Sequence, residues 1–179
     1  LAQSPLVQKI VVVPGNGGTA VEPKCKNVDK AACDYIEDNG VPAYVQIAQH
    51  EKCIMAIVGP ENPLAEGLAD DFWKADIPCI GPKKAAAELE ASKDFAKRFM
   101  HTYGIACAQS ETFDDSEQAK TYAERHGAPL VIKADGLAAG KGVIVAATVE
   151  EALSAIGAIM DSGSVGEAGK KIVIEDYLE

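Results

Sequence analysis

A glycine-rich segment with a lysine at its centre is the part of this chain whose residue types are best suited to chemistry. Residues 129–146 form an apolar run, a loop with three glycines and a second apolar run. Gly136, Gly140 and Gly142 can adopt conformations that let backbone N–H groups approach a ligand closely. Lys141, at the tip, adds a positive charge that suits a polyphosphate. The segment predicts a β-hairpin whose loop holds phosphate.

A second lysine lies inside the first arm of this hairpin. Residues two apart in a strand share a face, so Lys133 and Asp135 are expected to point away from the side of Ile132. A buried charge is costly unless it meets a counter-charge, so a lysine in an apolar strand favours a functional role. On the loop alone, a solvated turn remains the alternative. A Walker loop is excluded because Lys141 is followed by glycine and a strand.

Composition limits the classes of protein to consider. The chain has 179 residues and a formal net charge of −10, which suits one domain or two small ones and argues against a nucleic-acid surface. Its apolar runs are far shorter than the ~20 residues of a membrane span. The cysteines form no C-x-x-C pair and are expected to be buried in a reducing, cytoplasmic compartment. They are Cys25, Cys33, Cys53, Cys79 and Cys107.

The first half of the chain alternates expected strands with loops and helices. Apolar runs predict buried strands at residues 9–13 and 53–58, and a third, short strand at residues 77–80. Helical spacing is found at residues 42–52 and 64–73. Asn62 is the expected N-cap of the second helix, and Pro63 is its expected first residue. Residues 25–40 are ambiguous, because residues 29–37 have helical composition but poor periodicity. This alternation predicts an α/β domain with a parallel sheet that binds ligands at its strand ends.

In the second half, expected helices follow one another without a buried strand until the hairpin. The helices are predicted at residues 83–89, 92–103, 116–126 and 149–160. We place a domain boundary between residues 91 and 92. Residues 161–170 are glycine-rich and expected to be mobile, and residues 171–175 predict a last strand.

Five segments, in this order along nearly the whole chain, resemble one family. They read PGNGGT at 14–19, VGPENPL at 58–64, LEASK at 89–93, KADGLAAGKGV at 133–143 and IEDYLE at 174–179. In them the chain is similar to the phosphoribosylamine–glycine ligases, ATP-grasp enzymes of purine synthesis. The resemblance implies a parallel-sheet, Rossmann-like pre-ATP-grasp domain at residues 1–91 that lacks its first strand. It implies the first part of an α+β ATP-grasp domain at residues 92–179.

The resemblance also implies a reaction. ATP phosphorylates the glycine carboxylate, and the amine of 5-phosphoribosylamine displaces the phosphate to give glycinamide ribonucleotide. ADP and phosphate are the other products. The implied cofactors are ATP and Mg²⁺, which Mn²⁺ can replace, and the implied partners are small molecules, with fusion to further purine-synthesis domains as an option.

By the same resemblance, two groups of residues are expected to bind substrates. The nucleotide group is Lys93, Lys133, Asp135, Gly136, Gly140, Lys141, Gly142, Glu175, Asp176, Tyr177 and Leu178. Lys133 and Lys141 are its expected catalytic members, and residues 175–178 form the hinge that reads the adenine edge, chiefly by backbone groups. The phosphoribosylamine group is Asn16, Gly17, Gly18, Thr19, Gly59, Pro60, Glu61, Pro63 and Leu64.

The chain also departs from the family pattern. The Gly-Asn-Gly-Gly-Arg-Glu-His motif that opens the family is absent, and the metal ligands and glycine site are expected beyond residue 179. The chain is therefore expected to be a fragment that does not catalyse the reaction by itself. Two alternatives stay open: another ATP-grasp carboxylate–amine ligase, and a non-catalytic nucleotide-binding module. A dinucleotide-binding oxidoreductase is disfavoured, because no G-x-G-x-x-G joins a strand to a helix.

Overall fold

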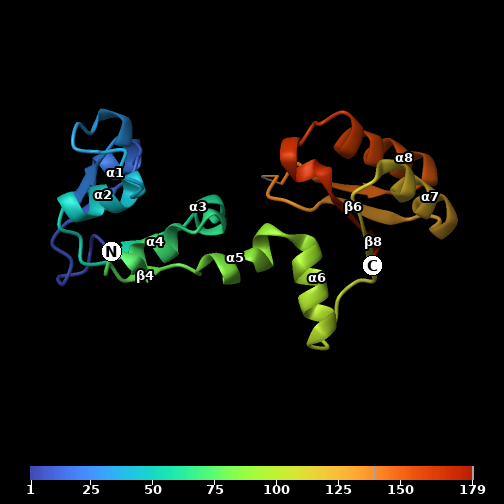
Figure 1. The fold of residues 1–179 in the computed structure, drawn as a ribbon, viewed down its shortest axis with the longest axis horizontal. Helices are drawn as coiled ribbons and strands as arrows, with labels where there is room; N and C mark the ends of the chain where they lie inside the picture. Colours follow the sequence, from blue (N-terminus) through green and yellow to red (C-terminus); the bar gives the residue numbers. More distant parts are fainter. Residues whose placement is uncertain (139, 179) are drawn as a thin grey trace. The chain divides into compact units, whose positions relative to one another are not determined.

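The computed structural model describes residues 1–138 and 140–178, and the chain divides into two compact units, residues 1–84 and 85–179 (Figure 1). The first unit contains β1 (Ile10–Val12), α1 (Gly17–Ala20), β2 (Cys25–Asn27), a 3₁₀ turn (Lys30–Ala32), α2 (Ala43–His50), β3 (Ala56–Ile57), α3 (Glu61–Glu66), α4 (Leu68–Lys74) and β4 (Cys79–Ile80). The predicted boundary at residue 91/92 lies between α5 (Lys84–Ala91) and α6 (Lys93–Thr102). The division at Lys84/Ala85 falls at the start of α5.

Strands of the first unit pair in parallel, as the alternation of strands and helices predicts. β1 pairs with β2, with Ile10 opposite Cys25, and β3 pairs with β4, with Ala56 opposite Cys79. The pairs belong to two separate two-stranded sheets. Each connection between paired strands contains helix, which is the requirement for joining parallel neighbours.

The prediction of a buried strand at residues 53–58 is wrong in extent and in burial. β3 comprises two residues, and Ile54 before it is 89% exposed. Ile57 and its register partner Ile80 are 49% and 56% exposed. Apolar composition indicated a core strand, but one face of this two-stranded sheet is open to solvent.

Two further local expectations differ from the structure. Residues 29–37, which have helical composition but poor periodicity, contain a 3₁₀ turn at Lys30–Ala32 capped by Asp29. The helix expected to start at Pro63, with Asn62 as its N-cap, begins at Glu61, with Pro60 in the N-cap position. Gly67, at φ 106°, separates α3 from α4, since a left-handed residue interrupts helical geometry.

Glu51, which follows α2, binds Lys9 before β1 and Lys26 in β2. These contacts make the stability of the first unit depend on pH. The Glu51 carboxylate binds Lys26 at 2.6 Å and Lys9 at 3.0 Å. Hydrogen bonds from Lys26 and then Lys9 lower the pKa of Glu51 to about 2. The pKa is depressed, so the stabilisation is present above the unfolded value of about 4.3 and is lost as pH falls toward 2.

Replacing Glu51 with glutamine is therefore expected to lower the free energy of unfolding at pH 6 and to have a much smaller effect at about pH 2, where the folded carboxylate becomes protonated. The single tryptophan, Trp73, lies in the first unit, so its fluorescence during urea unfolding reports on that unit. The exposed Glu22 provides the matched control, Glu22→Gln. A Glu51→Gln effect of equal size at both pH values would contradict the assignment.

The second unit is built on a four-stranded antiparallel sheet. Besides α5, whose first residue belongs to the first unit, and α6, it contains β5 (Ser110–Phe113), α7 (Ser116–His126), β6 (Leu130–Ala134), β7 (Val143–Ala146), α8 (Val149–Ile156), a π-helical turn (Gly157–Asp161), a 3₁₀ turn (Gly166–Lys170) and β8 (Ile172–Asp176). The strand order is β5-β8-β6-β7. α7 and α8 pack with the sheet around a core of buried aliphatic residues (Figure 1). The side chains on the opposite face of the sheet lie outside this core and can form a site.

The hairpin prediction is confirmed, and β6 alternates as expected. Leu130, Ile132 and Ala134 are fully buried, whereas Val131 and Lys133 are half-buried. β5 was not predicted, because three of its four residues are polar and it occupies the sheet edge. The expected helix at 149–160 ends its α-helical part at Ile156. In the expected mobile stretch, Gly166–Lys170 forms the 3₁₀ turn and Gly169 is buried.

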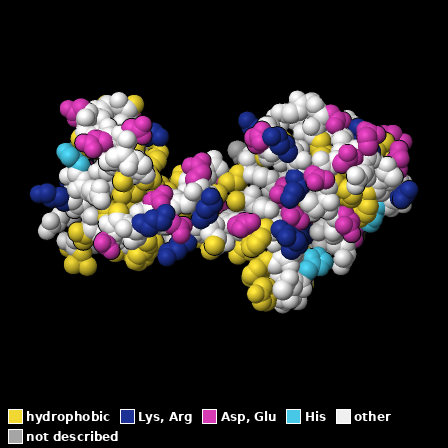
Figure 2. All heavy atoms as spheres, viewed as in Figure 1, with side chains coloured by type: hydrophobic (Ala, Val, Ile, Leu, Met, Phe, Trp, Pro, Cys, Tyr) yellow, Lys and Arg dark blue, Asp and Glu magenta, His cyan; other side chains and the backbone are white. Residues whose placement is uncertain are grey.

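The surface carries charges of both signs, and the cysteines are buried or half-buried. On the face shown in Figure 2, lysine and arginine side chains lie interspersed with aspartate and glutamate. Of the five free cysteines, Cys79 is buried and the others are half-buried, so full burial was predicted wrongly for four. In the described part of the chain, no helix has the length and apolar character needed to cross a membrane.

Candidate functional site

Two lysines share one buried carboxylate on the sheet face opposite α7 and α8. Lys133 Nζ of β6 lies 2.9 Å from Glu175 Oε2 of β8, and Lys97 Nζ of α6 lies 3.1 Å from the same oxygen. The Glu175 side chain is 8% exposed. The sequence predicted that Lys133 needs a counter-charge, and Glu175 provides it. Glu175 was expected to act chiefly through its backbone, whereas here its side chain forms two ion pairs.

Antiparallel pairing of β6 with β8 brings these groups together. Val131 is opposite Glu175 and Lys133 is opposite Val173. Lys133 and Glu175 are thus diagonal neighbours on one face, within reach of a long side chain. Neighbouring strands that are distant in the sequence create this contact, which no local pattern encodes.

Lys93 lies at the start of α6 and points to the beginning of the glycine-rich loop. Its Nζ donates to the carbonyl of Gly136 at 3.2 Å and to that of Asp135 at 3.5 Å. Burial lowers the pKa of Lys93, and the charge of Lys133 acts in the same direction, against the opposing effect of Asp135. The positive charge of Lys133 therefore acts on Lys93, and an anion bound near both ammonium groups would be stabilised by each of them.

Asp135 connects the loop to α6 rather than facing an open ligand site. Its Oδ1 accepts from the backbone N–H of Asp94 at 2.7 Å and from the Ser92 hydroxyl at 3.1 Å. Ser92 itself caps α6 by accepting from the Phe95 N–H at 3.1 Å. Since the first N–H groups of a helix have no intrahelical partner, these bonds fix the start of α6 and with it Lys93.

The glycine-rich loop leaves the sheet at Asp135 and returns at Gly142. Ala134 N–H donates to the Gly142 carbonyl at 2.7 Å, and Lys141 N–H donates to Ala138 at 2.9 Å. Gly140 has φ +78°. Lys141 is exposed, so its ammonium can reach outward from the tip. The loop also contains position 139, which lies outside the described residues.

The expected hinge continues from Glu175 along the carboxyl end of β8. Asp176 N–H donates to the Gln109 carbonyl at 3.0 Å, and its carboxylate lies 3.0 Å from His126 Nε2. Tyr177 and Leu178 are 45% and 67% exposed. The structure thus places nucleotide-group residues on α6, β6, the loop and β8, all within the second unit.

The residues expected to bind phosphoribosylamine form two loops in the first unit. Asn16 and Thr19 form a capping box, in which Asn16 Oδ1 accepts from Thr19 N–H at 3.0 Å and Thr19 Oγ1 accepts from Asn16 N–H at 2.9 Å. Asn27 of β2 holds this turn by bonds to both residues. These side chains are thus engaged within the loop, which leaves Gly17 and Gly18 to approach a ligand.

The second loop, residues 59–64, follows β3 and forms the first turn of α3. Leu64 is buried and a Cβ on Gly81 would lie 2.8 Å from its Cδ2, so Leu64 packs rather than facing solvent. Glu61 stands in the first turn of α3, which suits the positive end of a helix dipole. The two loops follow strands of different two-stranded sheets.

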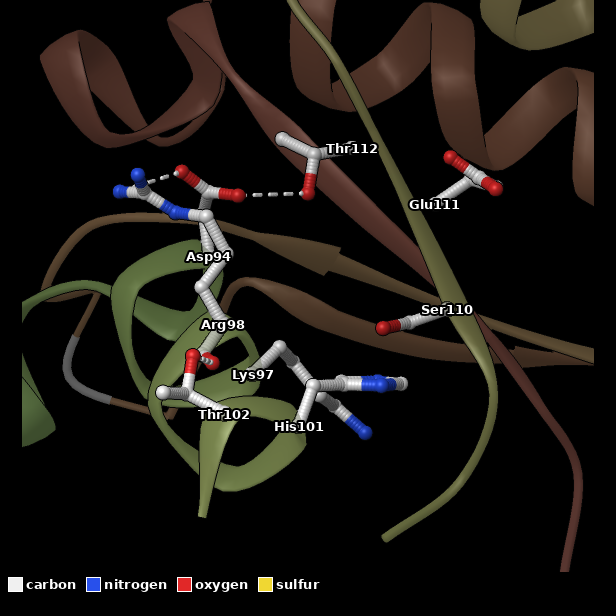
Figure 3. A pocket seen from close by; sticks show the side chains of 8 residues that line it. All are labelled: Asp94, Lys97, Arg98, His101, Thr102, Ser110, Glu111 and Thr112. Atoms are coloured by element: carbon white, nitrogen blue, oxygen red, sulfur yellow. Dashed lines mark hydrogen bonds and ion pairs between the residues drawn. The ribbon is translucent and has the colours of Figure 1, made fainter. Parts of the chain in front are cut away.

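Lys97 is the functional candidate that the sequence analysis missed. It lies four residues after Lys93, on the same side of α6, and like charges at that spacing are unfavourable unless an anion faces them. That pairing was the signal available in the sequence. Lys97 also lines a groove of about 520 Å³ between α6 and β5, whose polar walls include Asp94 bound to Arg98 and Thr112 (Figure 3). This groove contains none of the expected site residues.

The described residues contain no evident set of metal ligands. Among residues 1–138 and 140–178, no group of three His, Cys, Asp or Glu side chains is close enough to hold a metal ion. The described acidic groups at the site, Asp135 and Glu175, are already bound to Ser92 and to two lysines.

Comparison with known proteins places this arrangement in a family. The N domain model of phosphoribosylglycinamide synthetase matches residues 1–90, and the model of its ATP-grasp (A) domain matches residues 91–179. Phosphoribosylamine–glycine ligases from Neisseria meningitidis serogroup B and Haemophilus influenzae are 48% and 47% identical over 179 residues. Each match covers 100% of this chain and 40% of the relative.

A solved structure agrees with these matches. The crystal structure of phosphoribosylamine–glycine ligase from Thermotoga maritima is 27% identical and superposes with a TM-score of 0.66. The match covers 96% of this chain and 38% of that one. The predicted resemblance and fold class are confirmed: the chain belongs to the phosphoribosylglycinamide synthetase family, with a parallel-sheet N-terminal domain followed by ATP-grasp sequence.

Proposed function

We propose that this chain supplies the phosphoribosylamine-binding domain and one side of the ATP site of a phosphoribosylamine–glycine ligase. The enzyme transfers the γ-phosphoryl group of ATP to the glycine carboxylate, and the amine of 5-phosphoribosylamine then displaces phosphate from the acyl carbon. The observation that carries the proposal is the lysine cluster around Glu175 beside the glycine-rich loop, in a chain of this family.

Cations on this sheet face would serve the phosphoryl transfer. Negative charge on the triphosphate must be stabilised in the transition state, and preorganised cations in a partly dry site do this most effectively. Lys133 is held by Glu175 and is 27% exposed, so its ammonium is oriented before ATP arrives. Lys93 is anchored to the loop carbonyls, which places a second positive charge beside the first.

Nucleotide recognition is assigned to the two ends of this face. Exposed Tyr177 and Leu178 continue from β8 and would line the adenine, while backbone groups of residues 175–178 read its edge. The loop at 136–142 would cover the β- and γ-phosphates. Gly136 and Gly142 suit this role because the loop packs closely at both positions. A Cβ on Gly136 would lie 3.0 Å from Ala168, and a Cβ on Gly142 would lie 2.8 Å from the Ala134 Cβ.

The proposal extends to ATP with Mg²⁺ or Mn²⁺, to glycine and to a cytoplasmic setting. A divalent metal would neutralise the triphosphate and orient it for transfer. The described residues provide no cluster to hold the metal, so its ligands are expected elsewhere in the enzyme. Fusion to further purine-synthesis domains also stays a prediction.

A chimeric ligase tests the function directly. This chain would replace the 179-residue segment that it matches in the Neisseria meningitidis relative. We expect ADP formation that requires both glycine and 5-phosphoribosylamine, with glycinamide ribonucleotide as the product detected by mass spectrometry. Activity with a different acid or amine would favour another ATP-grasp ligase. ATP binding without any ligation would favour a non-catalytic nucleotide-binding module.

Replacing Lys141 with alanine in the chimera is expected to raise the KM for ATP by about tenfold, since one charge-assisted phosphate contact is lost. Lys141 is exposed, so the thermal unfolding temperature should not change. Lys74→Ala, at an exposed lysine paired with Asp71 in the first unit, is the matched control. Unchanged ATP affinity and turnover would return the loop to the alternative of a solvated turn.

A further inference from the structure

Lys97 is a buried lysine whose ammonium is fixed by two partners. Its side chain is 11% exposed. The Nζ donates to the Ala108 carbonyl at 2.9 Å and lies 3.1 Å from Glu175 Oε2. It is the buried residue of α6, whose other side chains are half-buried or exposed.

Packing alone does not account for a lysine at this position. A buried ion pair gains little stability over well-packed apolar residues of similar volume, because both charges must be removed from water. Methionine would fill the same space without that cost. The charge of Lys97 therefore has a use beyond holding α6 on the sheet.

The charge of Lys97 acts on Glu175, a carboxylate that Lys97 shares with Lys133. Lys97 and Lys133 approach the same oxygen, Oε2, at 3.1 and 2.9 Å. With Lys97 present, the carboxylate divides its attraction between two cations. Without Lys97, Glu175 would act on Lys133 alone and hold its ammonium more strongly, because opposite charges attract strongly where water is scarce.

We propose that Lys97 is a positioning residue for ATP binding: it fixes the Glu175 carboxylate and so leaves the Lys133 ammonium available to the phosphates. The inference rests on the proposed nucleotide site. Lys97 acts through Glu175 and itself faces the α6–β5 groove (Figure 3).

The neighbouring Arg98 offers a matched control on the same helix. Its side chain is 69% exposed and its guanidinium pairs with Asp94 at 3.3 Å (Figure 3). Lys97→Met and Arg98→Met each remove one positive charge and keep an unbranched side chain. Only the first change alters the surroundings of Glu175.

The experiment measures the dissociation constant for ATP by calorimetry in the chimeric ligase, together with kcat. Lys97→Met is expected to weaken ATP binding about tenfold with a smaller change in kcat, and Arg98→Met to change it less than about twofold. Lys97→Gln, which keeps a donor for the Ala108 carbonyl, should behave like Lys97→Met. In a Glu175→Gln background, Lys97→Met should have little further effect, since the shared carboxylate charge is gone.

Contrary results would bear either on the positioning role of Lys97 or on the proposed ligase function. Wild-type ATP affinity in both Lys97 variants would overturn the positioning role and leave the proposed function intact. An equal loss of affinity with and without Glu175→Gln would also overturn it, because Lys97 would then act independently of Glu175. A chimera that binds ATP but forms no glycinamide ribonucleotide contradicts the ligase proposal, while the Lys97 comparison still stands on ATP affinity.

Discussion

Replacing Lys133 with methionine in the chimeric ligase is expected to lower kcat/KM for ATP by about 100-fold or more, with most of the loss in kcat. The ammonium lies on the open sheet face, beside Lys93 and the glycine-rich loop. Its charge is oriented by Glu175 at 2.9 Å. Phosphoryl transfer spreads negative charge over the transferred group, so a fixed cation contributes more in the transition state than in the ground state.

The control must separate loss of charge at this site from loss of charge in general. Lys171 precedes β8 and pairs with Asp94 at 3.5 Å, with its side chain 43% exposed. Lys171→Met is expected to leave kcat/KM within about twofold, as for an exposed pair of little energetic value. An effect of Lys133→Met confined to KM would show that Lys133 stabilises bound ATP and transition state equally. No effect on either parameter would remove Lys133 from the catalytic group.

The second unit shows which parts of a site can be read from one sequence. The hairpin was predictable because residues 130–132 and 143–145 are rich in β-branched residues and are bounded by proline and glycine. The need for an anion beside Lys133 was predictable from the cost of burying charge. The identity of that anion was not predictable, because only the pairing of β6 with β8 brings Glu175 next to Lys133.

Lys97 and β5 were missed for related reasons. β5 is an edge strand whose sequence, Ser-Glu-Thr-Phe, is mostly polar, and edge strands need no continuous apolar run. In the sequence, Lys97 resembles an exposed lysine of a polar helix. It is buried because α6 approaches β8. The pairing of β5 and the burial of Lys97 depend on contacts between distant segments. The four-residue spacing of Lys93 and Lys97 was the local signal of a facing anion.

In the first unit, side chains within a few residues of one another form local structure that apolar composition does not indicate. Asn16 and Thr19 form a capping box in the loop after β1, which the sequence analysis did not single out. The apolar run at 53–58 indicated a buried strand, but Ile54 and Ile57 are exposed. A hydrogen-bonded turn is specified by side chains within a few residues of one another, whereas burial depends on what covers the strand.

Adding one methyl group at Gly142 is expected to disable the glycine-rich loop. A Cβ there would lie 2.8 Å from the Ala134 Cβ and 2.9 Å from the Ala138 Cβ. Ala134 is fully buried in β6 and bonds the Gly142 carbonyl at 2.7 Å, so the strand cannot yield and the loop must move. Gly142→Ala should therefore lower kcat/KM for ATP by about 100-fold, and overpacking should cost about 1–3 kcal/mol of stability.

Two comparisons isolate this steric cause. Apart from its chain neighbours, no atom of the described residues would lie within 4 Å of a Cβ on Gly140. The φ of Gly140, +78°, nevertheless disfavours a side chain, so Gly140→Ala should cost about 1–2 kcal/mol of backbone strain and impair ATP use less than Gly142→Ala. Ala138→Gly removes one of the two opposing methyl groups and should restore part of the activity of Gly142→Ala. If Gly142→Ala keeps full activity, or if Ala138→Gly gives no recovery, the close approach at Gly142 is not what shapes the loop for ATP.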